Sequence, residues 1–276
     1  MDHFTKLWQD FSKLPNVVAI ALGGSRSGDS FDQSSDYDLY VYCAATPDIT
    51  SRKRILNKHC HYIELNKHCH YIELNNHYWE LEDNGTLNDG TDIDILYRNI
   101  DNFLSDLEDV VEHHNSRIGY TTCFWHNLIN CQILYDPEDQ LQSLKERFEV
   151  SYPSQLQKQI IIQNRNLLTG KLPSYDKQII KALKRQDFVS THHRTTAFLD
   201  SYFDIIFALN KLTHPGEKRM ISYAKKNATL LPKHFEENII KLCHLNSNEH
   251  TVKETLNDII MHLDVMLKEN FQHFID

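Results

Sequence analysis

The chain has 276 residues, of which 41% are hydrophobic and 24% charged, so it has the composition of a globular protein and the length for two domains. No stretch approaches the roughly 20 consecutive apolar residues of a membrane helix, which excludes a membrane-spanning class. The formal net charge of −9 argues against non-specific binding to nucleic acid, because that binding needs a basic face.

The N-terminus and the cysteines indicate a cytoplasmic protein. The first residues, MDHFTKLWQDF, contain acids and no apolar core, unlike a secretory signal. The six cysteines are scattered without a CxxC pair, as expected of reduced thiols rather than of a disulfide framework. We therefore expect cytoplasmic localisation and no membrane partner.

The first half of the chain mixes strand and helix patterns. Runs of apolar, β-branched or aromatic residues predict strands over 17–22, 37–43, 79–83, 93–97 and 132–135. Apolar residues at helical spacing predict helices over 3–13, 50–58, 101–114 and 138–149. Asn84-Gly85 is a signal for a tight turn.

The second half changes character from Gln155 onward, where nearly every segment has 3.6-residue periodicity. Breaks near residues 170–173, 214–216, 231–232 and 246–248 divide it into five or six helices. The segment 196–212 is apolar almost all round, which predicts the central helix of a bundle. We therefore expect an α+β fold, with a small mixed β-sheet and flanking helices in a domain over 1–150 and an all-α helical bundle over 151–276.

The nine residues NKHCHYIEL occur twice in succession, at 57–65 and 66–74. An odd number of residues inverts the side-chain alternation of a strand, and nine residues leave a helix about half a turn out of phase. We predict that the copy lengthens a hairpin or a loop outside the core. Each copy contains His-Cys-His, but no carboxylate or second cysteine pair completes a tetrahedral transition-metal site.

Two short patterns in the first half point to phosphate chemistry. Gly23 and Gly24 end a predicted strand where missing side chains let a phosphate approach the backbone, and Ser25 offers a hydroxyl. Asp36 and Asp38 lie two residues apart on the next strand, so both carboxylates project from the same face. Adjacent carboxylates repel unless a cation lies between them, and Mg²⁺ is a hard, oxygen-seeking ion that suits them.

The segment LGGSRSGDSFDQSSDYDLYVY resembles the active-site motif of the DNA polymerase-β-type nucleotidyltransferase superfamily. That motif is Gly-Ser or Gly-Gly, roughly ten residues, an acid–apolar–acid triplet and a third acid on a later strand. The resemblance implies that the triphosphate is held by Gly24, Ser25 and Arg26. It implies that two Mg²⁺ ions are bound by Asp36, Asp38 and Asp94. The third acid, Asp94, would also help to deprotonate the acceptor hydroxyl.

The identity of the third acid has one alternative. Asp94 lies within the predicted strand 93–97, and Asp92 lies at its start on the same face. We favour Asp94 because apolar residues flank it on both sides.

The C-terminal half resembles the helical domain of aminoglycoside adenylyltransferases of the streptomycin/spectinomycin type. The likeness lies in DIIFALNKLTHPGEKRMISYAKK followed by LLP, which is a helix, a short loop with a lysine and a second helix ending in Leu-Pro. It implies that Lys218, alone or together with Lys211 or Arg219, reaches the triphosphate across an interdomain cleft. A solvated basic turn at a helix end would give the same pattern.

Together these patterns predict a Mg²⁺-dependent nucleotidyltransferase with ATP or another NTP as the donor. It would move a nucleoside monophosphate to a hydroxyl of a small acceptor, and the resemblance implies an aminoglycoside-like one. Two alternatives stay open. One is transfer of AMP to a protein, as by an antitoxin or a regulator, and the other is a non-catalytic nucleotide-binding module.

Overall fold

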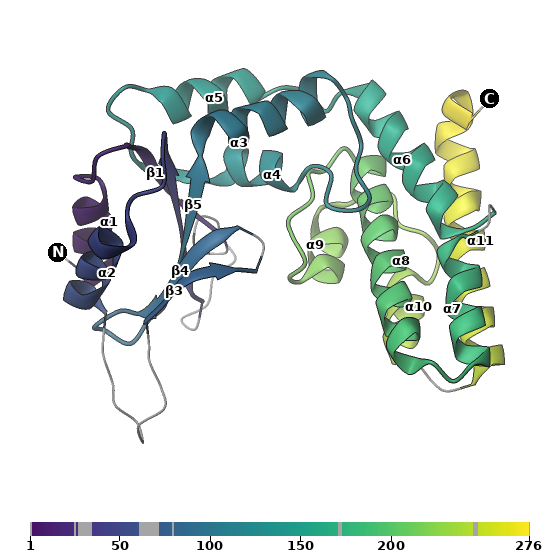
Figure 1. Ribbon diagram of the computed structural model, residues 1–276. Coiled ribbons are helices and arrows are strands. Elements are labelled where there is room, and N and C mark those ends of the chain that lie inside the picture. Colours follow the sequence, from purple (N-terminus) through teal and green to yellow (C-terminus); the bar gives the residue numbers. More distant parts are fainter. Residues whose placement is uncertain are drawn as a thin grey trace. The chain divides into compact units, whose positions relative to one another are not determined.

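The computed structural model describes residues 2–24, 26, 35–60, 72–78, 80–170, 173–244 and 248–275. Contacts between Cα atoms divide the chain into two compact units, whose elements are labelled in Figure 1. The first unit is Met1–Glu108 with Asn127–Glu149, and the second is Asp109–His126 with Val150–Asp276. We expected one boundary at residue 150, whereas residues 109–126 group by their contacts with the C-terminal helices.

Within the described residues, the first unit is built on a mixed six-stranded sheet in the order β3-β4-β5-β2-β1-β6. The strands are β1 (Val17–Gly23), β2 (Tyr37–Cys43), β3 (Ile72–His77), β4 (Leu81–Thr86), β5 (Asp92–Asn99) and β6 (Gln132–Tyr135). β2 and β5 are parallel, and the other neighbouring pairs are antiparallel. The sheet and the helices beside it confirm the expected α+β fold class.

One face of this sheet packs against two helices and forms the core of the unit. The helices of the first unit are α1 (His3–Phe11), α2 (Ile49–His59), α3 (Ile100–Leu107) and α5 (Gln140–Phe148). α1 and α2 pack against each other and lie beside the sheet in Figure 1. Their apolar residues Phe11 and Leu56 share a buried cluster with Leu39 and Val41 of β2 and Ile95 of β5. Every second residue of the two central strands is therefore committed to the core.

The opposite face of the sheet carries polar and aromatic residues. Asp38, Tyr40 and Tyr42 alternate with the core residues of β2 and so point to this face. Arg98 of β5 lies over the Tyr40 ring at 3.9 Å and donates hydrogen bonds of 2.6–3.0 Å to both carboxylate oxygens of Glu80. The Tyr42 end of this face is fully buried, whereas Asp38 is half-buried.

The structure differs from the sequence prediction in four elements in or next to this unit. Asn84 and Gly85 lie inside β4 rather than in a turn, because both pair with β3 on one side and β5 on the other. The expected helix 101–114 ends at Leu107 and continues as a π-helical turn, η2 (Glu108–Glu112). β3 and the helix α4 (Cys123–Asn130) were not predicted.

The duplicated segment lies largely outside the described residues. The first copy begins in the last turn of α2, where His59 is 3% exposed and Cys60 is 5% exposed. The second copy ends in β3, which is the first strand in the order of the sheet. The prediction of a lengthened hairpin or loop concerns residues 61–71 and stays a prediction.

The second unit is a helical bundle around α8. Its helices are α6 (Ser154–Leu168), α7 (Tyr175–Lys184), α8 (Phe188–Leu209), α9 (Met220–Asn227), α10 (Phe235–Cys243) and α11 (Glu249–Ile275). α8 packs against α6 and α7, and almost every residue from 201 to 209 is buried, as the apolar segment 196–212 predicted. In the described part of the chain, no helix combines the length and apolar character needed to cross a membrane.

A buried carboxylate fixes residues 117–122 to the helices of this unit. Asp204 of α8 is 2% exposed and accepts hydrogen bonds from the backbone N (3.1 Å) and Oγ1 (2.6 Å) of Thr121. It also accepts a hydrogen bond of 3.2 Å from Nδ2 of Asn164 on α6. Burial raises the pKa of Asp204 to about 7, and the nearby Asp200 carboxylate adds to this rise, while the hydrogen bonds oppose it.

This pKa makes stability depend on pH. Because the pKa of Asp204 lies above the ordinary 3.8, the folded state binds this proton more tightly, and the free energy of unfolding falls as pH rises from about 4 to about 7. One pKa unit corresponds to about 1.4 kcal/mol, so the loss is at most about 4 kcal/mol. Asp204→Asn cannot ionise and is expected to gain stability relative to the wild type between about pH 5 and pH 8 in urea unfolding.

The exposed Glu269→Gln on α11 is the control for removing one negative charge, and it should show no such gain. An Asp204→Asn stability difference that stays constant over this pH range would contradict the assignment.

Candidate active site

β1 ends at two glycines that make room for side chains of β2. A Cβ added to Gly23 would lie 2.1 Å from the ring of Tyr40, and one added to Gly24 would lie 1.7 Å from Oδ2 of Asp38. Gly24 also has a φ of +59°, which disfavours a side chain. We expected these glycines to admit a phosphate, whereas Tyr40 and Asp38 occupy the space of the missing side chains. The glycines thus let the Asp38 carboxylate lie against the end of β1.

The structure brings two of the predicted acids, Asp38 and Asp94, side by side. Asp36 is half-buried directly before β2, and Asp38 is half-buried within it. Asp38 is the Cα partner of Gly23 in β1 and of Asp94 in β5. Paired residues of neighbouring strands point to the same face with backbones about 5 Å apart. The carboxylates of Asp38 and Asp94 are therefore neighbours on the polar face of the sheet.

Two residues of β4, Asn84 and Glu82, extend this surface and were missed by sequence reasoning. Asn84 is the Cα partner of Asp94, and its Nδ2 donates to Oδ1 of Asp94 at 2.6 Å. The same Nδ2 donates to Oε1 of Glu82 at 3.4 Å, and Glu82 is 9% exposed. Three adjacent strands thus contribute carboxylates to one face. Glu82 lies in the predicted strand 79–83, which was the signal available in the sequence. The turn predicted at Asn84-Gly85 ended that strand too early for Asn84 to be included.

Asp92, the alternative third acid, has a different environment. It is exposed at the start of β5, and its Oδ1 accepts a hydrogen bond of 2.6 Å from Oγ1 of Thr86, its Cα partner. Asp94, in contrast, is half-buried and pairs directly with Asp38. This geometry favours Asp94 over Asp92.

The residues predicted to hold the triphosphate are described only in part. Ser25 lies outside the described residues. Nε of Arg26 donates to the backbone O of Ser35 at 2.6 Å, and its guanidinium lies 4.1 Å from the ring centroid of Tyr37. The Tyr37 ring in turn stacks on Phe4 of α1 with centroids 4.0 Å apart. Arg26 thus ties the end of β1 to the start of β2, and its contact with phosphate stays a prediction.

Lys218 belongs to the second unit. It is exposed in the turn that precedes α9. The turn begins at His214, which is 0% exposed and whose backbone N donates to Oγ1 of Thr122 at 2.8 Å. Burial lowers the pKa of His214 to about 3, so this imidazole is neutral at physiological pH. The predicted reach of Lys218 to a triphosphate stays a prediction.

The ligand atoms on the polar face suit a hard cation. In the described part of the chain, no three His, Cys, Asp or Glu side chains converge as a ready-made metal site. Mg²⁺, however, is usually held by one or two protein carboxylates together with substrate phosphates. Asp38 and Asp94 are two carboxylates held as neighbours, and both offer oxygen atoms to a cation. These residues therefore fit Mg²⁺ better than a transition metal, which prefers nitrogen or sulfur ligands.

The resemblance implied an acid–apolar–acid triplet and a third acid on a later strand, and the structure places Asp38 of the triplet opposite Asp94 of β5. The sheet unit is followed by the helical region that was expected.

Comparisons with known proteins give the following similarities. A family model described as "Domain of unknown function (DUF4037)" matches residues 122–220, which include Asp204 and His214. No curated protein matches the chain. A nucleotidyltransferase-like protein from Exiguobacterium sibiricum 255-15 is similar with 12% identity and a TM-score of 0.39, over 95% of this chain and 72% of that one.

Two adenyltransferase structures are also similar to the chain. An aminoglycoside 6-adenyltransferase from Bacillus subtilis matches with 11% identity and a TM-score of 0.33, over 97% of this chain and 89% of that one. A spectinomycin adenyltransferase from Enterococcus faecialis, solved with ATP and spectinomycin, matches with 10% identity and a TM-score of 0.28, over 92% of this chain and 98% of that one.

Proposed function

We propose that this chain is a nucleotidyltransferase that moves AMP from ATP, or another nucleoside monophosphate from its NTP, to a hydroxyl of a small aminoglycoside-like acceptor. The observation that carries the proposal is the pairing of Asp38 with Asp94 beside Gly24. Two carboxylates held as neighbours on a half-buried surface favour a bound cation, and such a cation in turn binds phosphate.

The proposed reaction is an in-line displacement at the α-phosphorus of the nucleotide. The acceptor oxygen forms the new P–O bond, the bond to the β-phosphate oxygen breaks, and pyrophosphate leaves. The proton of the acceptor hydroxyl passes to Asp94, which acts as the general base. Nδ2 of Asn84 donates to Oδ1 of Asp94 and so orients this carboxylate.

We propose that Asp36, Asp38 and Asp94 hold two Mg²⁺ ions. Mg²⁺ bound there would neutralise the triphosphate and stabilise charge on the attacking and leaving oxygens. The buried Glu82 is linked to Asp94 through Asn84, whose Nδ2 donates to both carboxyl groups.

The overall charge of the chain points to a cationic acceptor. A chain with a net charge of −9 attracts cations in general, and aminoglycosides are polycations. We therefore place aminoglycosides first among the acceptors to be tested.

The test is incubation of the purified chain with Mg²⁺ and each of the four α-labelled NTPs. Each reaction receives either a panel of aminoglycosides or a bacterial lysate. Label on an aminoglycoside supports the proposal, and label on a protein band replaces it with protein-directed transfer. Tight nucleotide binding without transfer would identify a binding module instead. The Asp36→Ala/Asp38→Ala variant must abolish any transfer that depends on this site.

Asn84 gives a prediction about positioning. Asn84→Leu removes the donor to Asp94, so kcat is expected to fall about 10- to 100-fold, in the range of other groups that orient a ligand. KM for the nucleotide should change little, because Asn84 acts on the carboxylate and not on the phosphates. Steady-state kinetics of Asn84→Leu and of the exposed Asn102→Leu on α3 measure the difference. Equal kcat values for the two variants would show that Asn84 has no such role.

A further inference from the structure

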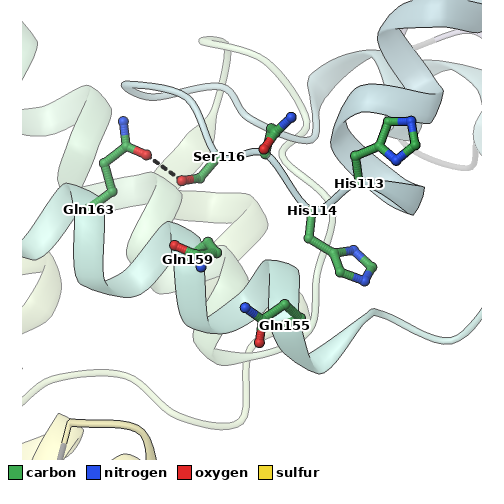
Figure 2. Close-up of a pocket in the computed structure, with 7 residues that line it drawn as sticks. His113, His114, Ser116, Gln155, Gln159 and Gln163 are labelled. Atoms are coloured by element: carbon green, nitrogen blue, oxygen red, sulfur yellow. Dashed lines mark hydrogen bonds between the residues drawn. The ribbon is translucent and has the colours of Figure 1, made fainter.

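The second unit contains a polar pocket that nucleotidyl transfer does not use. It has a volume of about 390 Å³, within the roughly 300–1,000 Å³ of small-molecule sites. The residues that line it are His113, His114, Asn115, Ser116, Gln155, Gln159 and Gln163. Figure 2 shows three glutamines along α6 and the segment after η2 facing them. Both walls belong to the same compact unit.

The two walls are fixed by the local structure. Gln155, Gln159 and Gln163 are spaced by four residues, which places them on one side of α6. Oγ of Ser116 donates to Oε1 of Gln163 and ties the facing segment to the helix (Figure 2). Beside Ser116, the backbone N and Nδ2 of Asn115 donate to Asp109 at 3.0 and 2.6 Å. The segment that faces α6 is therefore held in place by these bonds.

One wall residue points to a missing partner. His114 has a φ of +61°, a conformation that non-glycine residues adopt infrequently. Its Nδ1 is buried and has no hydrogen-bond partner in the described part of the chain. A buried polar atom without a partner costs about 1–3 kcal/mol, so a turn of the imidazole ring that presents Nδ1 to a ligand in the pocket would remove this cost. The preceding π-helical turn is a feature that often occurs at functional sites.

The chemical groups that line the pocket indicate the class of ligand that it would bind. It contains no carboxylate, ammonium or guanidinium group, so the lining offers a charged ligand no permanent countercharge. It contains no aliphatic side chain and no Phe, Tyr or Trp, so an apolar ligand would gain little. Each amide offers both a donor and an acceptor, and so does each hydroxyl of a polyol.

We propose that this pocket binds an uncharged small molecule with several hydroxyl groups, such as a sugar or a cyclitol. Gln155 and Gln159 contact neighbouring hydroxyls, and Nδ1 of His114 takes part in a further hydrogen bond. This binding is independent of the proposed transfer reaction, and it would stand if the chain transferred no nucleotide.

The test uses ligand-observed saturation-transfer NMR and calorimetry on the full chain. The uncharged probes are myo-inositol and methyl glucoside, and the charged comparison probes are glucosamine and glucose 6-phosphate. We expect binding of an uncharged probe in preference to its charged counterparts. In Gln155→Leu/Gln159→Leu, loss of two hydrogen bonds should raise Kd about tenfold or more. Asn166→Leu, an exposed amide on α6 outside the pocket, should leave Kd unchanged.

A second measurement does not depend on the double variant. The imidazole ¹⁵N resonances of His114, assigned with His114→Asn, should shift when the uncharged probe is added. Preference for a charged probe would overturn the proposal. So would a double variant that binds like the wild type, or the absence of any binding by the uncharged probes.

Discussion

Asp38→Asn is expected to lower nucleotidyl transfer on the order of 10³-fold or more while the protein stays folded. The change keeps the shape of the side chain and removes its negative charge beside Asp94. Charge stabilisation by bound metal contributes several kcal/mol to such reactions, and each 1.4 kcal/mol is a factor of ten in rate. Single-turnover transfer assays measure the loss, and circular dichroism verifies the fold.

Asp94→Asn and Asp92→Asn form a matched pair for the same experiment. Both remove one carboxylate from β5, but only Asp94 is paired with Asp38, and Asp92 is exposed beside Thr86. Asp94→Asn should resemble Asp38→Asn, and Asp92→Asn should keep most of the activity. The reverse order would make Asp92 the third acid, and full activity in Asp38→Asn would remove the basis of the proposed function.

Gly24→Ala is expected to lower transfer at least 100-fold through displacement of Asp38. The added Cβ would lie 1.7 Å from Oδ2 of Asp38, so this carboxylate must move away from its position beside Asp94. A misplacement of about 1 Å in a reacting geometry can cost about 100-fold in rate. The measurement is kcat/KM for transfer together with the midpoint of urea unfolding.

Gly90→Ala is the matched control for backbone strain. Gly90 has a φ of +91°, and a Cβ there would meet no atom within 4 Å. Alanine at either glycine is strained by about 1–2 kcal/mol, but only Gly24→Ala also collides with a carboxylate. We expect backbone strain to destabilise both variants and loss of transfer to occur in Gly24→Ala alone. Equal losses of activity in Gly24→Ala and Gly90→Ala would show that the loss of transfer comes from lower stability.

The sequence predicted the elements whose pattern is local. The apolar run before Gly23 and the aromatic run 37–43 gave β1 and β2 almost to the residue, because buried strands are continuous in apolar or β-branched residues. β3 was missed because its sequence, IELNNH, contains two asparagines and few apolar residues. The turn expected at Asn84-Gly85 was wrong because pairing with strands on both sides overrides a local turn preference.

Only the part of the candidate site that depends on spacing within one strand could be predicted. Asp36 and Asp38 share a segment, so their common face follows from the alternation of side chains. Whether Asp38 and Asp94 lie next to each other depends on the register of the parallel strands β2 and β5, and no local sequence pattern encodes this register. Glu82 and Asn84 enter the site through the β4–β5 register for the same reason.

The path of the chain between the two units limits how the protein can be divided. The backbone passes from one unit to the other after Glu108, after His126 and after Glu149. A fragment that stops at residue 150 would keep Thr121 and Gly119 but lose Asp204 and Asn164, which accept their hydrogen bonds. No single truncation therefore yields either unit intact. A separately expressed sheet unit would need residues 109–126 replaced by a short linker rather than a cut at one end.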